Sequence, residues 1–132
     1  ANAGMEFGSH TVNHPDVTQL APADLERELA ESKREIEQRT GRRAEHFCYP
    51  YGKWNPLVRD ATARHYRSAC TTIAGTAGHT DDHRLLPRVD AHYLRSPRLF
   101  RAMFTLRFEA YISARRLARR LRGQPEGGYR SA

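Results

Sequence analysis

The sequence predicts an α/β fold with parallel strands. Three segments of strand character, 46–49, 67–72 and 85–89, alternate with segments of helical periodicity at 22–40 and 56–65. Such alternation favours parallel strand pairs joined by crossover helices, because each helix carries the chain back to the start of the next strand. The number of strands is small for a closed barrel or a doubly wound sheet.

The clearest element is a helix over 22–40. Pro22 suits the first helical position, where a missing N–H costs nothing, and Gly41 suits the residue after the end. Leu25 and Leu29 belong to one narrow apolar stripe at helical spacing, which predicts one buried face. Acidic side chains in the first turns suit the helix dipole and are expected to face solvent: Asp24, Glu26 and Glu28.

The other elements follow from local signals. Asn55 and Pro56 predict the start of the second helix, as its N-cap and its first residue. Residues 5–7 alternate apolar and polar side chains, so we expect a short strand that leads into the segment 8–16. Residues 73–83 are rich in Gly, Thr, Asp and His and predict a loop.

The positive charge of the chain is concentrated near its C-terminal end. The net charge is +7, yet residues 1–94 hold 12 Arg and Lys against 13 Asp and Glu, while residues 95–122 hold nine Arg against one Glu. We expect 95–122 to form one long amphipathic, Arg-rich helix that begins at Ser96 and Pro97. Residues 123–132 are Gly-rich and are expected to be a disordered tail.

The composition argues against several classes of protein. No apolar run approaches the ~20 residues that a membrane-spanning helix needs, and residues 1–4 have neither the basic start nor the apolar core of a signal peptide. Cys48 and Cys70 lack metal-type spacing and lie in apolar, strand-like runs. Buried thiols are therefore expected rather than a disulfide framework, and the compartment stays open.

Two histidines four residues apart give the first chemical signal. If the segment 8–16 coils, His10 and His14 fall on one face with Cβ atoms about 5–6 Å apart. Two imidazoles can then reach one zinc ion at about 2.0–2.1 Å each, although other divalent metals suit imidazole too. A catalytic zinc wants a third protein ligand and an open position for water. The alternative is a pair of solvated histidines.

Two stretches together resemble a known enzyme family. Residues 5–16 resemble the second motif of the polysaccharide deacetylases, the NodB-like carbohydrate esterases, and residues 47–55 resemble their third motif. The order and the spacing of the two stretches match as well, and the resemblance covers about residues 1–90. It implies a distorted (β/α) barrel of which this chain would be the C-terminal half. We therefore divide the chain into three parts: 1–94, the C-terminal part of the deacetylase domain; 95–122, the basic helix; and 123–132, the tail.

The resemblance implies a metal-dependent hydrolase that removes acetyl groups, most often N-acetyl, from a polysaccharide or oligosaccharide. In that chemistry a metal lowers the pKa of a bound water and stabilises the oxyanion. His10 and His14 match the two histidine ligands of zinc or another divalent metal. Tyr51 matches the residue whose backbone N–H faces the oxyanion. The neighbouring candidates for substrate contact, each with structural packing as the alternative, are Tyr49, Pro50, Gly52 and Trp54.

The sequence departs from the family pattern at three places. The Asp pair that supplies the third metal ligand and the base lies upstream of the His-x3-His motif in the family and has no counterpart before His10. The third motif often starts with Arg, and Cys48 stands there. The general-acid histidine of the family has no clear match among His79, His83 and His92. We therefore expect an incomplete domain that binds zinc weakly without turnover, or else a degenerate and inactive deacetylase-like module.

The Arg-rich segment offers a reading of a different class. An amphipathic basic helix can lie on an anionic membrane surface, with a merely solvated helix face as the alternative. Nucleic acid is not an expected partner, because the rest of the chain is not basic and no recognition motif is present. The side chains that would carry the membrane contact are Arg101, Arg107, Arg115, Arg116, Arg119, Arg120 and Arg122.

Overall fold

The centre of the fold is a parallel sheet of three strands. The computed structural model describes residues 4–103 and 105–123. In this part of the chain the strands lie in the order β1 (His46–Cys48), β2 (Ser68–Ala74) and β3 (Leu86–Arg88). Both strand pairs are parallel, which confirms the α/β class and the expected crossover connections. These three strands do not close a barrel.

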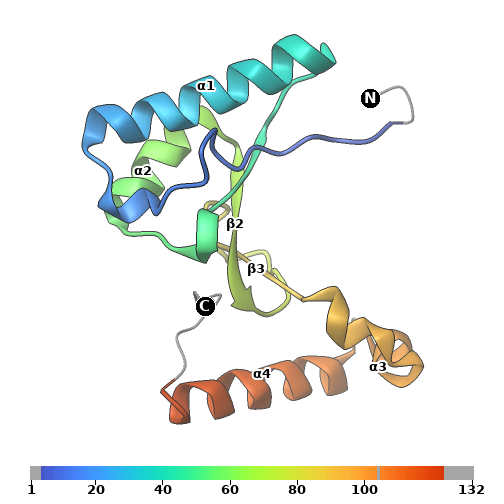
Figure 1. Ribbon diagram of the computed structural model, residues 1–132. Coiled ribbons are helices and arrows are strands. Elements are labelled where there is room, and N and C mark those ends of the chain that lie inside the picture. The colour runs from blue at the N-terminus through green and yellow to red at the C-terminus, as the bar shows by residue number, and fades with distance from the viewer. Residues whose placement is uncertain (1–3, 104, 124–132) are drawn as a thin grey trace.

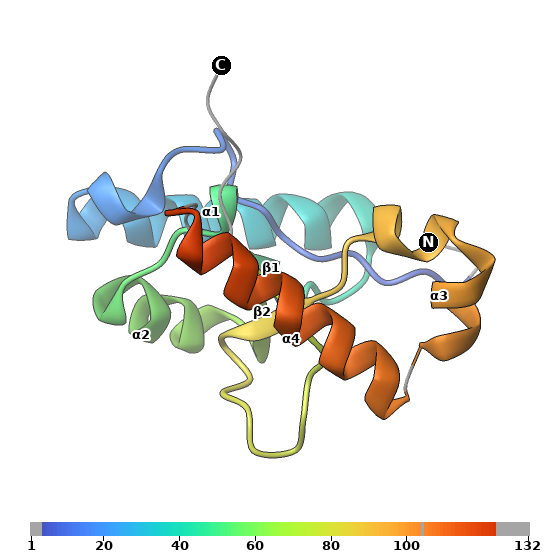
Figure 2. The ribbon, with the colours of Figure 1, turned by 90° about the horizontal axis from the view of Figure 1, so that it is seen from below.

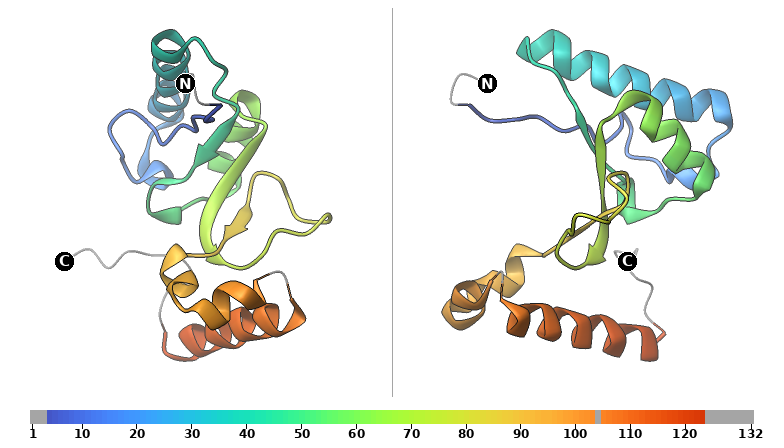
Figure 3. Two further views of the ribbon diagram at one scale, coloured as in Figure 1. Left: turned by 90° about the vertical axis from the view of Figure 1, so that its right-hand side faces the viewer. Right: turned by 180° about the vertical axis from the view of Figure 1, so that it is seen from behind.

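Two helices cover one face of the sheet. Helix α1 (Pro22–Thr40) connects towards β1, and α2 (Pro56–His65) connects β1 to β2; Figures 1 and 3 show them side by side on the same side of the strands. Leu29 and Val58 from the helices pack with Phe47 and Ala69 from the strands, and all four are nearly inaccessible to water. This packing makes the main core, because apolar area removed from water is the largest favourable contribution to folding.

The helix boundaries follow the capping signals of the sequence. Gly41 ends α1 in the left-handed conformation, with φ 66°, and its N–H donates to the carbonyl oxygen of Glu37 at 2.9 Å. Asn55 caps α2, since its side-chain oxygen accepts a hydrogen bond from the N–H of Val58 at 2.9 Å. The predictions for 22–40 and 56–65 are confirmed.

The strand expected at residues 5–7 is wrong, because the pairing with β1 occurs two residues later, at Ser9. The only pairing of this segment in the described residues is a parallel bridge between Ser9 and Phe47. In this bridge the N–H of Ser9 donates to the carbonyl oxygen of His46 at 2.8 Å, and Ser9 in turn accepts from Cys48. A Cβ on Gly8 would lie 3.3 Å from the carbonyl oxygen of His46, so the missing side chain permits the close approach here.

The single helix expected over 95–122 is also wrong. The segment forms a short 3-10 turn η3 (Ala91–Arg95), then α3 (Pro97–Ala102), then α4 (Leu106–Leu121). Met103 breaks the helix with an extended ψ of 136°, and the Thr105 hydroxyl accepts a hydrogen bond from the N–H of Phe108 at 3.4 Å. Thr105 thus provides a new cap, which competes with continuing the helix.

Helix α4 lies beyond the end of β2 that is far from α1 (Figures 1 and 2). It buries Phe108 and Ile112, and the hydroxyl of Thr76 donates to the Glu109 carboxylate at 3.3 Å. None of the described helices combines the length and the apolar character that crossing a membrane requires. The predicted tail falls outside the described residues except for Gly123.

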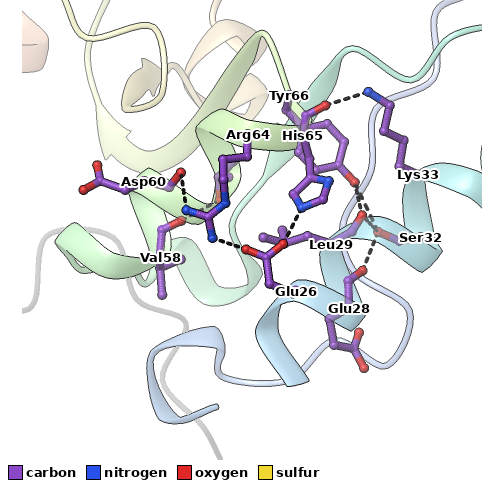
Figure 4. A network of polar contacts seen from close by, with 11 residues as sticks. Glu26, Glu28, Leu29, Ser32, Lys33, Val58, Asp60, Arg64, His65 and Tyr66 are labelled. Atoms are coloured by element: carbon purple, nitrogen blue, oxygen red, sulfur yellow. Dashed lines mark hydrogen bonds and ion pairs between the residues drawn. The ribbon is translucent and has the colours of Figure 1, made fainter. Parts of the chain in front are cut away.

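A polar cluster joins the first half of α1 to the C-terminal end of α2 (Figure 4). The carboxylate of Glu26 accepts a hydrogen bond from Nε2 of His65 at 2.6 Å and forms an ion pair with Arg64. Nζ of Lys33 donates to the carbonyl oxygen of His65 at 2.6 Å. Glu26 was expected to face solvent; its side chain is 39% exposed and also binds the C-terminal turn of α2.

Candidate functional site

The parallel pairing brings the two sequence motifs to one edge of the sheet. Ser9 pairs with Phe47 in parallel, so the residues that follow each of them leave the pair in the same direction. His10 follows Ser9, and the turn η2 (Pro50–Gly52) follows β1. This is the edge at the carboxyl ends of the strands, where open α/β sheets place their ligands.

The rings of His10 and His14 lie together, next to the ring of Tyr51. The centroids of the two imidazoles are 4.7 Å apart, and those of His14 and Tyr51 are 4.6 Å apart, both pairs edge to face. The segment is a loop and not the helical coil that was considered from the spacing. Its turn is closed by a hydrogen bond from the N–H of His14 to the hydroxyl of Thr11 at 3.0 Å.

The hydrogen bond of His10 determines which ring nitrogen is available. Nδ1 of His10 lies 2.6 Å from the carbonyl oxygen of Cys48. A carbonyl oxygen can only accept, so Nδ1 carries the hydrogen and Nε2 of the neutral ring keeps its lone pair. A carbonyl partner of this kind orients the histidine ligands of metal sites. Nε2 of His10 and a ring nitrogen of His14 are therefore the candidate ligands for zinc or a similar divalent metal.

The candidate metal ligands are two in number. Among the residues that the structure describes, no three His, Cys, Asp or Glu side chains come together as a metal-binding group. The acidic residue nearest in sequence, Asp16, is occupied by Lys53, whose Nζ donates to Oδ2 at 2.6 Å. Burial raises the pKa of Asp16, but hydrogen bonds from Lys53 and Thr18 outweigh it and hold that pKa below its ordinary value. This pair joins the two motif segments.

Backbone strain is concentrated in the same place. Three residues other than glycine have a positive φ in the described part of the chain: Thr11 at 67°, His14 at 54° and Tyr51 at 58°. Each such residue costs about 1–3 kcal/mol and persists only where its surroundings enforce it, most often at functional sites. All three belong to the two motifs, which is an independent indication that this edge is the functional one.

The third residue of the turn η2 has room for no side chain larger than that of glycine. Gly52 has φ 69°, and a Cβ there would overlap the hydroxyl of Thr72 and lie 2.8 Å from the Cβ of that residue. The hydrogen bonds that close the turn run from the N–H groups of Gly52 and Lys53 to carbonyl oxygens of Tyr49 and Pro50. The N–H of Tyr51 is not part of them.

The predicted substrate-contact residues divide into accessible and buried ones. The Tyr51 side chain is 41% exposed, and Trp54 is half-buried against the edge of the core. Pro50 and Gly52 are buried and shape the turn. Tyr49 is 1% exposed and its hydroxyl donates to the carbonyl oxygen of Arg84, while burial raises the pKa of Tyr49 to about 12. Tyr49 therefore packs in the core, which is the structural alternative to a substrate contact.

The sequence interpretation missed Glu28. This residue is 7% exposed, and one carboxylate oxygen accepts from the N–H groups of Val12 at 2.8 Å and Asn13 at 3.1 Å. The other oxygen accepts from the side-chain amide of Asn13 at 2.6 Å. Burial raises the pKa of Glu28, yet these hydrogen bonds outweigh it and leave the pKa below its ordinary value. The signal that was missed is the helical spacing of Glu28 from Leu25 and Leu29, which places all three on the buried face of α1.

The three late histidines lie in exposed positions. His79 and His83 are in the loop between β2 and β3, and His92 is in η3. The side chain of Cys48, at the start of the third motif, is partly buried, and burial raises the pKa of its thiol. These observations do not identify a general acid among the four residues.

Comparison with known proteins identifies the family. The sequence model of the polysaccharide deacetylase family matches residues 1–68. The chain is 33% identical over 63 residues to the uncharacterized protein YlxY of Bacillus subtilis (strain 168), a match that covers 48% of this chain and 20% of YlxY. The chain thus spans about a fifth of the length of this relative.

Solved structures of deacetylases are similar as well. The deacetylase PplD of Streptococcus pyogenes, in complex with acetate, is 31% identical with a TM-score of 0.64, over 67% of this chain and 39% of PplD. The polysaccharide deacetylase BC0361 of Bacillus cereus is 32% identical with a TM-score of 0.56, over 62% of this chain and 26% of BC0361. With the family model covering more than half of its length, the chain belongs to the polysaccharide deacetylase family.

Proposed function

We propose that this chain carries part of the active site of a metal-dependent hydrolase that removes acetyl groups, N-acetyl first, from a polysaccharide or oligosaccharide. Membership of the family supports the hydrolase class. The observation that carries the metal dependence is the paired geometry of His10 and His14, with Nδ1 of His10 bound to Cys48. PplD, the similar deacetylase, was solved with acetate, which is the small product that deacetylation releases.

Each residue of the site has a proposed role. Nε2 of His10 and a ring nitrogen of His14 hold zinc or another divalent metal, which when bound supplies a Lewis acid and an activated water. The backbone N–H of Tyr51 donates to the oxyanion, a contribution of about 10²–10³ in rate at comparable sites. The Tyr51 ring and Trp54 contact the sugar, and Pro50 and Gly52 set the shape of the turn.

The site still needs a third metal ligand and a catalytic base. We propose that a third ligand and the catalytic base are carboxylates outside the residues described here, and that 1–94 is the deacetylase part of the chain while 95–122 is an addition to it. The 132-residue chain alone then binds zinc weakly and does not turn over substrate. An inactive deacetylase-like module is the alternative; two adjacent aspartate codons in the gene before Ala1 would argue against it.

Zinc titration tests the metal site. The 132-residue chain and its His14→Ala variant are titrated with zinc by isothermal calorimetry, with His79→Ala as a matched control in an exposed loop. We expect His14→Ala to lose about tenfold or more in affinity, because a single imidazole remains, and His79→Ala to bind as wild type. Equal binding by wild type and His14→Ala would remove the metal from the proposal.

Helix α4 supports a second candidate function, contact with an anionic membrane surface. Its exposed leucines, Leu106 at 84%, Leu117 at 57% and Leu121 at 80%, fall on one face of the helix beside several arginines. Amphipathic basic helices of this type bind at the lipid interface. The chain is pelleted with phosphatidylglycerol–phosphatidylcholine vesicles. Leu117→Gln with Leu121→Gln is expected to reduce pelleting, and Leu57→Gln on α2, 52% exposed, is the control.

A further inference from the structure

The carboxylate of Glu28 binds the backbone between the two candidate ligands. Figure 4 shows Glu26 turned towards Arg64 and His65, whereas the Glu28 carboxylate, two residues further along α1, is directed away from them. Its partners are the uncharged donors of Val12 and Asn13, described above. We infer that Glu28 is a positioning residue, which holds the segment between His10 and His14 so that the two imidazoles converge. This role rests on the proposed metal-dependent function.

The loop needs such a partner because its conformation is unfavourable by itself. Thr11 and His14 on either side of the bonded segment have a positive φ, which a short free loop would not maintain. Two consecutive N–H groups, of Val12 and Asn13, point at one oxygen of a buried anion. A loop conformation that withdrew these N–H groups would leave a buried charge without its donors, and that penalty is larger than for a neutral group.

The same helical turn also holds the start of the loop. The Ser9 hydroxyl donates to the Ser32 hydroxyl at 2.7 Å, and Ser32 donates to the carbonyl oxygen of Glu28 at 2.7 Å. Ser9 is 1% exposed and Ser32 is 4% exposed, so these bonds are protected from water. Helix α1 therefore fixes the residue before His10 through Ser32 and the residues after His10 through Glu28. The packed core holds the helix itself in place through Leu29.

The experiment compares two variants that weaken the contact with one that does not. Glu28→Gln keeps the size of the side chain and removes its charge, and Asn13→Ala removes one donor while leaving α1 intact. The control is Glu31→Gln on the same helix, where the side chain is 45% exposed and pairs with Arg34 at 3.6 Å. Amide hydrogen exchange of residues 12 and 13 is measured in metal-free protein, and zinc is then titrated while the imidazole signals of His10 and His14 are followed by NMR.

We expect both variants to exchange these two amides faster than wild type and to bind zinc about tenfold more weakly, as when an outer partner of a metal ligand is removed. Glu31→Gln should change neither quantity. Asn13→Ala decides the matter if Glu28→Gln does not fold. Unchanged exchange and unchanged zinc affinity in a folded variant would overturn the inference.

The two proposals fail in different ways. If wild type and His14→Ala bind zinc equally, the metal site is lost, whereas protection of the amides by Glu28 is measured without metal and stands or falls alone. If zinc binding needs His14 but is indifferent to Glu28 and Asn13, the metal site stands and the positioning role is wrong.

Discussion

Nδ1 of His10 donates to the carbonyl oxygen of Cys48 at 2.6 Å, so a candidate ligand is oriented by the backbone of the adjacent strand. The bond joins the last residue of β1 to the first residue after the Ser9 bridge. Because both atoms belong to the paired edge of the sheet, the orientation of the imidazole depends on the sheet and not on the mobility of a loop side chain.

The tautomer of His10 is the first prediction. In long-range ¹H–¹⁵N NMR spectra at about pH 8.5, where imidazoles are neutral, His10 should carry its hydrogen on Nδ1. His79, exposed in the loop after β2, should show a mixture of both tautomers. A hydrogen found on Nε2 of His10 would contradict the hydrogen bond and with it the availability of that nitrogen for a metal.

The second prediction concerns the left-handed glycine of the η2 turn. Gly52→Ala should lower the free energy of unfolding by about 2–5 kcal/mol, because a left-handed alanine and an overpacked contact with Thr72 add together. Gly41→Ala has nearly the same φ with nothing within 4 Å and should cost about 1–2 kcal/mol. Urea unfolding measures both. Equal losses would show that Thr72 moves aside.

The third prediction is a pH dependence of stability. Hydrogen bonds from His65 and Arg64 hold the pKa of Glu26 below its ordinary 4.5. Because the folded state has the lower pKa, this contribution is complete above the unfolded pKa and is lost as the pH falls through the folded one. The difference in unfolding free energy between wild type and Glu26→Gln should therefore shrink below about pH 4.5.

Glu35→Gln is the matched control for this measurement. Glu35 pairs with Arg39 at 3.0 Å on the exposed face of the same helix, and exposed pairs contribute little to stability. Its effect at neutral pH should be smaller than that of Glu26→Gln. If the gap between wild type and Glu26→Gln stays constant on acidification, the cluster at the end of α2 does not stabilise the fold through ionised Glu26.

The fourth prediction concerns the reactivity of Cys48. Burial raises the pKa of this thiol, and the nearby Arg88 offsets the effect only in part. Since the thiolate is the nucleophile, iodoacetamide at about pH 8 should alkylate Cys48 severalfold more slowly in folded protein than in urea. Peptide mass spectrometry gives the rate for this residue by itself. Equal rates in the two states would show that the thiol is accessible and ionises normally.

Local signals were enough to predict most element boundaries. Pro22 and Gly41 determine the ends of α1, and Asn55 determines the start of α2, because caps act through the residues next to them. The break before α4 was missed since the apolar spacing continues across Met103. The cap at Thr105 and the burial of Phe108 decide the break, and burial depends on packing against distant residues.

For the site, the sequence predicted which residues come together but not how. The convergence of His10 and His14 with Tyr51 was expected from the two motifs, and the rings do lie side by side. The loop that achieves it was not predictable, because its left-handed residues are maintained by a carboxylate on another element. Glu28 lies 16 residues after Val12, and nothing in the local sequence couples them.

The three left-handed residues also bear on how this protein can change over generations. Thr11, His14 and Tyr51 each hold the chain in a conformation that glycine or asparagine would adopt with less cost. Selection for heat resistance alone would thus favour replacements at these positions. The same replacements would remove side chains from the segment that holds His10 and His14 and from the turn η2. Stability and the proposed roles of the site are therefore opposed at these three residues, and a more thermostable variant that keeps those roles should gain its stability elsewhere.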